Sequence, residues 1–404
     1  MIDEQKREGL FGSQLDEGSL EVQFRGWLAD HGLMVDAHEA FRCRNGLPAN
    51  GFSLTGIKVD FPYELSLFSG RRSWPKLEVD TMIEGHVRKA ARSRRERLVA
   101  NLIGKPSTEE GRAELRRWLE ALFPSVDDVD YAVWSHWLWT VKATLAGRRN
   151  VPLPLMINVT GAQGAGKSWA VRRLCEPLEE LALPNCDAAL LTDERKRLAL
   201  TRYNVAVWDE LGGLDRADSN ALKSTLTSEE LEYRPMRQNS SQAIANCCRF
   251  IGTSNESVSY LMADTTGARR FYEMECRRRA EFHTMQEIRP EIVWQAVSEL
   301  EPDPINGFEP ELSERQMVLV PVDTVACWLG EEDWYPLGVC GEARIDPSRG
   351  LSYTQLRERY SDFSRRTGHA QAMLGASAFR SRLKQEGWET SKACGRTVYR
   401  LPAK

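Results

Sequence analysis

The chain has 404 residues, of which 42% are hydrophobic and 28% are charged, and its formal net charge is -4. This composition is typical of a globular protein of two or three domains, and no run of about 18 apolar residues is available to cross a membrane. The slightly acidic balance argues against a uniformly basic nucleic-acid binder, while the charged N-terminus and the nine scattered cysteines favour a cytosolic protein with reduced thiols and no zinc site.

Residues 1–75 carry no pattern to which we assign a function. Residues 76–148 are predicted to form a helical collar for oligomerisation. Within them, Ser107 precedes an amphipathic stretch ending at Leu122, as expected of a helix with a capping residue. The stretch 131–145 carries tryptophans at helical spacing, which favours core packing over a functional stripe.

Residues 149–300 alternate between apolar strands and helical stretches. Strands are expected at 155–159, 205–208, 250–253 and 270–276. Strands separated by helices predict an α/β fold with a parallel sheet that carries helices on both faces.

The first expected strand leads into the segment 161–168, GAQGAGKS, which has the spacing of a phosphate-binding loop. Glycines let several backbone N–H groups point at one anion, and the following helix adds its positive end. Lys167 is expected to reach the β- and γ-phosphates of ATP, and Ser168 to ligate Mg²⁺. A chance match is disfavoured because a strand precedes the loop and a helix follows it. The expected nucleotide contacts are Gly161, Gln163, Gly164, Ala165, Gly166, Lys167, Ser168 and Trp169.

Two acids, Asp209 and Glu210, end the second strand about 40 residues after the loop. Asp209 is expected to hold Mg²⁺ together with Ser168, and Glu210 to polarise the attacking water. The alternative is an acidic turn without a catalytic role. A second carboxylate suits hydrolysis better than phosphoryl transfer to a small molecule, because water must be activated.

Two further polar sites follow along the chain. Asn255 ends the third strand, where it would sense the γ-phosphate or position water, unless it is simply a turn residue. Arg269 and Arg270 directly precede the fourth strand. One of them could stabilise transition-state charge at a neighbouring subunit's site, although the sequence does not choose between them and a surface ion pair is the alternative.

An insertion separates the acids from the third strand. Its pattern predicts a helix over 219–229 that carries Lys223. A strand, a polar turn and a returning strand are predicted to follow from 231 to 248. Arg234, Arg237 and Gln238 would crowd the tip of this hairpin. The hairpin either grips single-stranded DNA in the channel of a ring or is an ordinary charged surface feature.

Charge divides the remaining chain. Residues 301–350 carry 11 acidic and 3 basic side chains, and residues 351–404 carry 4 acidic and 11 basic ones. We therefore predict an acidic linker or loosely packed extension over 301–345 and a basic DNA-binding domain over 346–404.

Five motifs occur in a characteristic order: GAQGAGKS at 161–168, Asp209-Glu-Leu, Tyr233-Arg-Pro, GTSN at 252–255 and TGARRF at 266–271. In this order of motifs the sequence resembles the virulence-associated protein E family, which is similar to the superfamily 3 helicases of phages and satellite elements. The resemblance implies an AAA+ P-loop ATPase core, a hexameric ring, Mg-ATP sites between subunits and 3′→5′ movement on single-stranded DNA. It also implies an arginine finger at Arg269 or Arg270 and a channel hairpin at about 234–242.

The basic tail resembles the C-terminal winged helix of related replication helicases. Its recognition-type helix would carry Arg380, Arg382 and Lys384, and would contact origin duplex DNA. A surface that aids solubility or contacts a partner is the alternative. No primase-like arrangement is evident in the first 75 residues, so a separate primase or replisome protein is the expected partner.

Three functions remain in competition. The first is an ATP-dependent DNA helicase for replication of a phage or mobile element, and the second is an ATP-controlled DNA-binding initiator or loader that does not translocate. The third is a small-molecule kinase. The acid pair, the arginines and the basic hairpin favour the first over the third.

Overall fold

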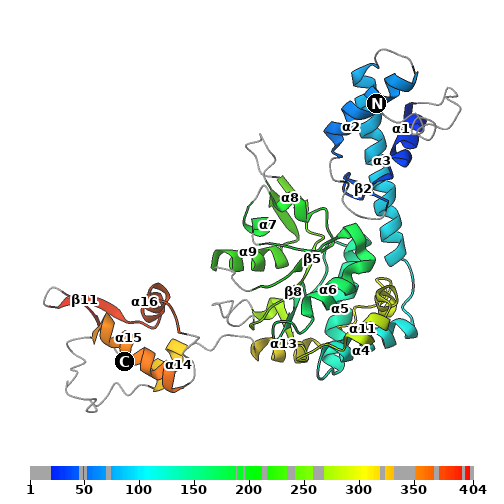
Figure 1. The fold of residues 1–404 in the computed structure, drawn as a ribbon. Coiled ribbons are helices and arrows are strands. Elements are labelled where there is room, and N and C mark those ends of the chain that lie inside the picture. Colours follow the sequence, from blue (N-terminus) through cyan, green and yellow to red (C-terminus); the bar gives the residue numbers. More distant parts are fainter. Residues whose placement is uncertain are drawn as a thin grey trace. The chain divides into compact units, whose positions relative to one another are not determined.

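The computed structural model describes residues 20–44, 49, 52–69, 74–187, 189–193, 196–211, 216–233, 242–257, 268–318, 324–331, 351–367, 373–393 and 396–400. The chain divides into two compact units. The first unit comprises Met1–Glu256 and Arg270–Ser313, and the second comprises Ser257–Arg269 and Glu314–Lys404. Figure 1 colours the elements of both along the sequence.

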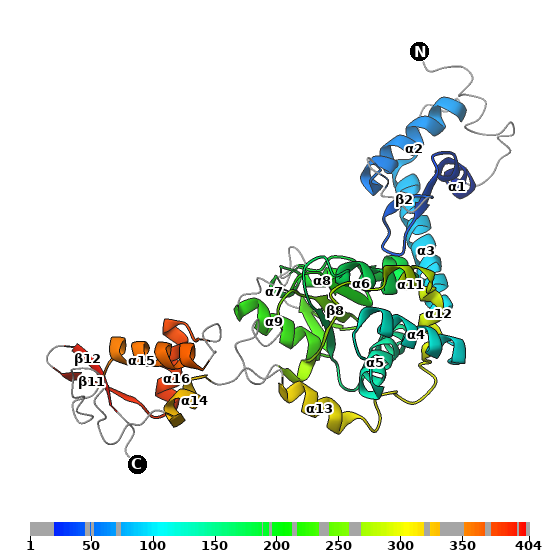
Figure 2. The same ribbon diagram turned by 60° about the horizontal axis from the view of Figure 1, so that its bottom comes forward.

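The first unit begins with a small subdomain made of α1 (Leu20–Asp30), β1 (Leu33–Val35), β2 (Phe41–Cys43), α2 (Leu54–Ser69) and the long α3 (Lys76–Leu102). The two strands pair antiparallel, and the helices gather around one end of α3 (Figure 2). A separate apolar core joins Phe24, Phe61 and Ile83, whereas Leu98 and Leu102 at the other end of α3 belong to the main core. The boundary that we predicted at residue 75 therefore precedes a helix that both cores share.

The helices α4 (Glu109–Leu122) and α5 (Asp128–Leu145) share the main apolar core with the central sheet. The indole of Trp137 donates to the carbonyl of Phe250 over 2.9 Å, which ties α5 to a sheet strand. The side chain of Thr108, not Ser107, caps α4 by accepting from the amide of Gly111. The predicted capping residue, Ser107, therefore lies one position before the observed one. Its hydroxyl donates to Glu301 instead.

A five-stranded parallel sheet forms the centre of the first unit, in the order β4-β5-β8-β3-β9. Its strands are β3 (Met156–Thr160), β4 (Ala182–Leu183), β5 (Val205–Trp208), β8 (Arg249–Thr253) and β9 (Phe271–Glu275). Four of them match the predicted strands within one residue or two. The edge strand β4 is missing from the prediction because it has two residues, too few for any periodic pattern. The predicted α/β class with a parallel sheet is confirmed.

Helices and a hairpin are inserted between these strands. The helices are α6 (Lys167–Cys175), the 3₁₀ turn η2 (Glu176–Leu181), α7 (Ala189–Thr192), α8 (Arg197–Leu200) and α9 (Arg216–Thr227). The hairpin consists of β6 (Glu230–Tyr233) and β7 (Gln242–Ala245), which pair antiparallel as expected. Its predicted tip, with Arg234, Arg237 and Gln238, lies outside the described residues.

The chain after β8 continues through η3 (Ala268–Arg270), β9, α11 (Phe282–Glu287), α12 (Pro290–Val293), η4 (Trp294–Ala296) and α13 (Glu309–Val318). The start of the expected acidic linker is not a linker. Asp303 pairs with the buried His136 over 2.7 Å, and Ile305 and Leu312 lie in the main core. Apolar residues spaced between the acids anchor this stretch, which the net charge alone did not reveal.

The second unit contains α14 (Thr324–Glu331), β10 (Leu351–Ser352), α15 (Tyr353–Arg366), α16 (Ala376–Gln385), β11 (Glu389–Ala393) and β12 (Arg396–Arg400). Its sheet is antiparallel in the order β10-β12-β11. Trp328, Tyr360 and Phe379 fill its core. The expected sequence of two helices and a hairpin after Leu351 is present.

Candidate functional site

A tight glycine loop joins β3 to α6. Gly161 and Gly166 both have positive φ, at 136° and 98°. A Cβ atom at Gly166 would lie 2.5 Å from the ring of Phe282, and one at Gly161 would lie 2.7 Å from the sulfur of Cys276. Only glycine meets both the backbone and the packing requirements at these positions.

Lys167, the first residue of α6, turns back over the loop. Its ammonium donates to the carbonyls of Gly161 and Ala162 over 2.7 and 2.8 Å, and to the side-chain oxygen of Asn255 over 3.0 Å. The residue is only 7% exposed. A cation is thus held at the mouth of the loop, where a phosphate would replace the two carbonyls.

The carboxylate of Asp209 is the centre of a second group of contacts. Ser168 and Thr253 donate to its Oδ1 over 2.5 and 2.8 Å, and Arg172 donates to its Oδ2 over 2.6 Å. The pairing of β5 with β8 explains this geometry, because parallel neighbours bring Asp209 and Thr253 to the same edge of the sheet.

Glu210 has a left-handed backbone, with φ of 63°. For a residue other than glycine this conformation costs on the order of 1–3 kcal/mol and is frequent at functional sites. The side chain of Asn255 donates to the Glu210 carboxylate over 3.3 Å. Asn255 therefore connects Lys167 with Glu210, the two charged groups expected to face the γ-phosphate and the water.

These groups surround one cavity of about 410 Å³. Nine of the expected residues line it, and they are Gln163, Gly164, Gly166, Lys167, Ser168, Trp169, Asp209, Glu210 and Asn255. Gly161 and Ala165 do not. Ala165 is fully buried and its amide donates to the carbonyl of Ala162, so its role is to shape the loop.

Sequence reasoning missed three residues of this site, namely Arg172, Thr253 and Ser254. A signal existed for two of them. Arg172 follows Ser168 by four residues, a spacing that puts both on one side of a helix, and Thr253 directly precedes the polar strand end. Ser254 lies within the GTSN motif, but no local pattern predicts that its hydroxyl accepts from the buried Asn158.

The donor set fits Mg²⁺ with a triphosphate. Ser168 and Asp209 supply the hard oxygen ligands that Mg²⁺ requires, and Lys167 supplies the balancing charge. The loop leaves no room for a Cβ at Gly166, as expected where backbone must approach an anion.

The expected arginines lie elsewhere. Neither Arg269 nor Arg270 lines the cavity, and both belong to the short η3 turn. Arg269 is exposed, and its carbonyl accepts from Gln316 over 2.8 Å.

The described DNA-contact candidates differ in exposure. Lys223 is buried, with 6% exposure, which contradicts the expected contact with a DNA backbone. It lies on the inward side of the amphipathic helix α9. In the second unit Arg380 and Lys384 are exposed on α16. Arg380 stacks over the ring of Tyr353 at 4.2 Å, and Arg382 pairs with Glu386.

The parallel sheet, the glycine loop ahead of Lys167 and the acid pair after β5 define an α/β protein of the P-loop class. The virulence-associated protein E-like domain matches residues 108–316, just over half of the chain. The chain therefore belongs to this family, which confirms the resemblance drawn from the five motifs.

No curated protein matches the sequence. Among solved structures the chain is similar to the NrS-1 C terminal region, with 17% identity and a TM-score of 0.45 over 76% of this chain and 78% of that chain. It is also similar to JCV helicase, with 12% identity and a TM-score of 0.35 over 68% of this chain and 84% of that chain. Among the residues that the structure describes, no helix combines the length and apolar character needed to span a membrane.

Proposed function

We propose that the chain is an ATP-dependent DNA helicase, a hexameric AAA+ motor of the superfamily 3 type that replicates a phage or mobile element in a bacterial cytoplasm. The observation that carries the proposal is the continuous set of contacts from Lys167 through Asn255 to Glu210, beside the Ser168–Asp209 pair. Groups for phosphate binding, metal binding and water activation thus converge on one cavity.

Each residue has a separate task in the proposed hydrolysis. Lys167 would exchange its two loop carbonyls for phosphate oxygens, and Ser168 and Asp209 would hold a Mg²⁺ ion, which would neutralise phosphate charge. Glu210 accepts a hydrogen bond from the attacking water, and Asn255 fixes the position of that carboxylate. The strained backbone at Glu210 is consistent with a side chain aimed by function rather than by local preference.

DNA would be held outside this cavity. The β6–β7 hairpin is the proposed channel element. The second unit, with the helices α14, α15 and α16, a three-stranded antiparallel sheet and exposed basic residues on α16, is the proposed winged helix for duplex DNA.

The decisive experiment compares ATP hydrolysis with and without single-stranded DNA and, in parallel, measures strand displacement on a tailed duplex. We expect DNA-stimulated hydrolysis with displacement. Stimulation without displacement would identify the loader instead, and no hydrolysis under either condition would refute the motor. An Arg237→Ala variant is expected to lose single-strand affinity while keeping basal hydrolysis.

A further inference from the structure

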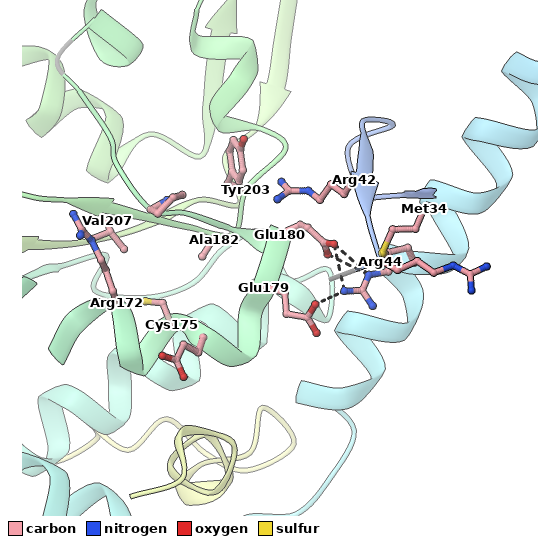
Figure 3. Close-up of a pocket in the computed structure, with 13 residues that line it drawn as sticks. Met34, Arg42, Arg44, Arg172, Cys175, Glu179, Glu180, Ala182, Tyr203 and Val207 are labelled. Atoms are coloured by element: carbon pink, nitrogen blue, oxygen red, sulfur yellow. Dashed lines mark hydrogen bonds and ion pairs between the residues drawn. The ribbon is translucent and has the colours of Figure 1, made fainter. Parts of the chain in front are cut away.

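Arg172 lies between two cavities of the first unit. On one side its guanidinium donates to Asp209 of the nucleotide cavity over 2.6 Å and to the side chain of Asn185 over 3.0 Å. On the other side it lines a cleft of about 660 Å³. Figure 3 shows Arg172 at one end of this cleft and Met34 and Arg42, from the N-terminal strands, at the other.

Every oxygen of Asp209 already has a partner. Ser168 and Thr253 occupy Oδ1, and Arg172 occupies Oδ2. The guanidinium neutralises the charge that a divalent cation needs from this carboxylate. Since two cations that pair with one carboxylate repel each other, Arg172 opposes metal binding at Asp209 as long as it stays in place.

An alternative anion is within reach along the same helix. Glu176 follows Arg172 by four residues and continues the helical backbone of α6, with φ of -51° and ψ of -42°. This spacing places the two side chains on one side of a helix. Both line the same cleft, and Glu176 is half-exposed, so its carboxylate is open to a second cation beside Arg173.

Arg172 also has space in which to change its partner. Its side chain is 48% exposed, in contrast to the buried Lys167, and the cleft beside it provides the space. A long, half-exposed arginine changes partner at little cost, because surface ion pairs contribute about 0–1 kcal/mol.

We propose that Arg172 is a positioning residue that competes with Mg²⁺ for Asp209 and moves to Glu176 when the metal binds. This inference rests on the proposed nucleotide site. The Arg172–Asp209 pair would then raise the Mg²⁺ concentration that ATP binding requires, because the metal must displace the guanidinium.

The test is a Mg²⁺ titration of the binding of a fluorescent ATP analogue, which does not depend on hydrolysis. Arg172→Ala is expected to lower the half-saturating Mg²⁺ concentration roughly two- to fivefold, the size of a half-exposed ion pair. Glu176→Gln removes the negative charge of the alternative partner and is expected to raise the half-saturating Mg²⁺ concentration. These opposite signs are not expected of a merely structural role.

Two controls separate other effects. Arg116→Ala removes a side chain of similar exposure, 46%, that is paired with Asp128 away from the cavity, and is expected to leave the requirement unchanged. Arg173→Ala breaks the Arg173–Glu176 pair but keeps the Glu176 charge, so it must not raise the requirement.

The outcomes distinguish this inference from the function on which it rests. If the unaltered chain binds the analogue normally but Arg172→Ala has the same or a higher Mg²⁺ requirement, the inference is overturned and the site stands. If the unaltered chain shows no Mg²⁺-dependent binding at all, the proposed function is overturned and the inference with it.

Discussion

The glycine loop and the arginine pair are both expected to serve one reaction, but they differ in their surroundings. The loop is closed within the first unit, where Lys167, Asp209 and Glu210 all contact groups of the same cavity. Arg269 and Arg270 line no part of that cavity, and the division between the two units falls between them. In our proposed ring, one chain would hold the binding half of the site, and another copy would supply the charge stabilisation in the transition state.

The largest expected effect is at the glycine loop. Lys167→Ala removes the cation that would bind the β- and γ-phosphates, so both nucleotide binding and hydrolysis are expected to fall to background. Binding of a fluorescent ATP analogue and phosphate release measure the two. Lys196→Ala, an exposed lysine in a turn, is the control. Hydrolysis at the unaltered rate in Lys167→Ala would remove the loop assignment.

Substitutions of the arginine pair should affect ATP hydrolysis but not ATP binding. Arg269→Ala or Arg270→Ala is expected to bind ATP normally but to hydrolyse it roughly a thousandfold more slowly, the usual contribution of an arginine finger. Mixing the affected variant with Lys167→Ala protein should restore part of the rate, because one interface then has both parts. Arg289→Ala, an exposed arginine paired with Glu110, is the control. Failure of every mixture to recover activity would place the arginine within its own subunit's site.

A smaller effect tests how tightly the loop is shaped. Gly166→Ala places a Cβ against Phe282 and forces alanine into φ of 98°. We expect a loss of about 3 kcal/mol in unfolding free energy, together with weaker nucleotide binding. Chemical denaturation measures the first. Gly85→Ala, where a Cβ meets nothing within 4 Å, should be neutral or slightly stabilising. Equal stability of the two variants would contradict a strained loop.

The sequence predicted the parts of this molecule that depend on local pattern. The loop, the acids and four strands follow from short motifs and apolar runs, since each needs only its own neighbours in the chain. Contacts between distant segments were out of reach. Examples are the pairing of Asp303 with His136, the hydrogen bond from Thr253 to Asp209, and the burial of Lys223. A charge count treated residues 301–313 as a linker because it gave no weight to Ile305 and Leu312.

The buried Lys142 is a second cation held by carbonyl oxygen, and it contrasts with Lys167 because no ligand is expected to claim it. Its ammonium donates to the carbonyl of Val297 over 2.7 Å, and the residue is 3% exposed. Burial lowers the pKa of Lys142 to about 8, although the nearby Glu299 opposes the shift. Because the folded pKa lies below the unfolded value, the unfolded chain binds more protons between about pH 8 and 10.5, and stability rises with pH across that window.

Replacing this lysine should remove that pH dependence. Lys142→Met is expected to raise the free energy of unfolding by about 2 kcal/mol at pH 7, after allowing for the lost hydrogen bond to Val297. The gain should shrink steadily above pH 8, because the unaltered lysine then folds without a charge to desolvate. Urea unfolding of the first unit at pH 7 and pH 9.5 measures the difference, with Lys196→Met, at an exposed site, as the control. A Lys142→Met gain that stayed constant from pH 7 to 9.5 would mean that the ammonium keeps its charge inside the core, balanced by Glu299.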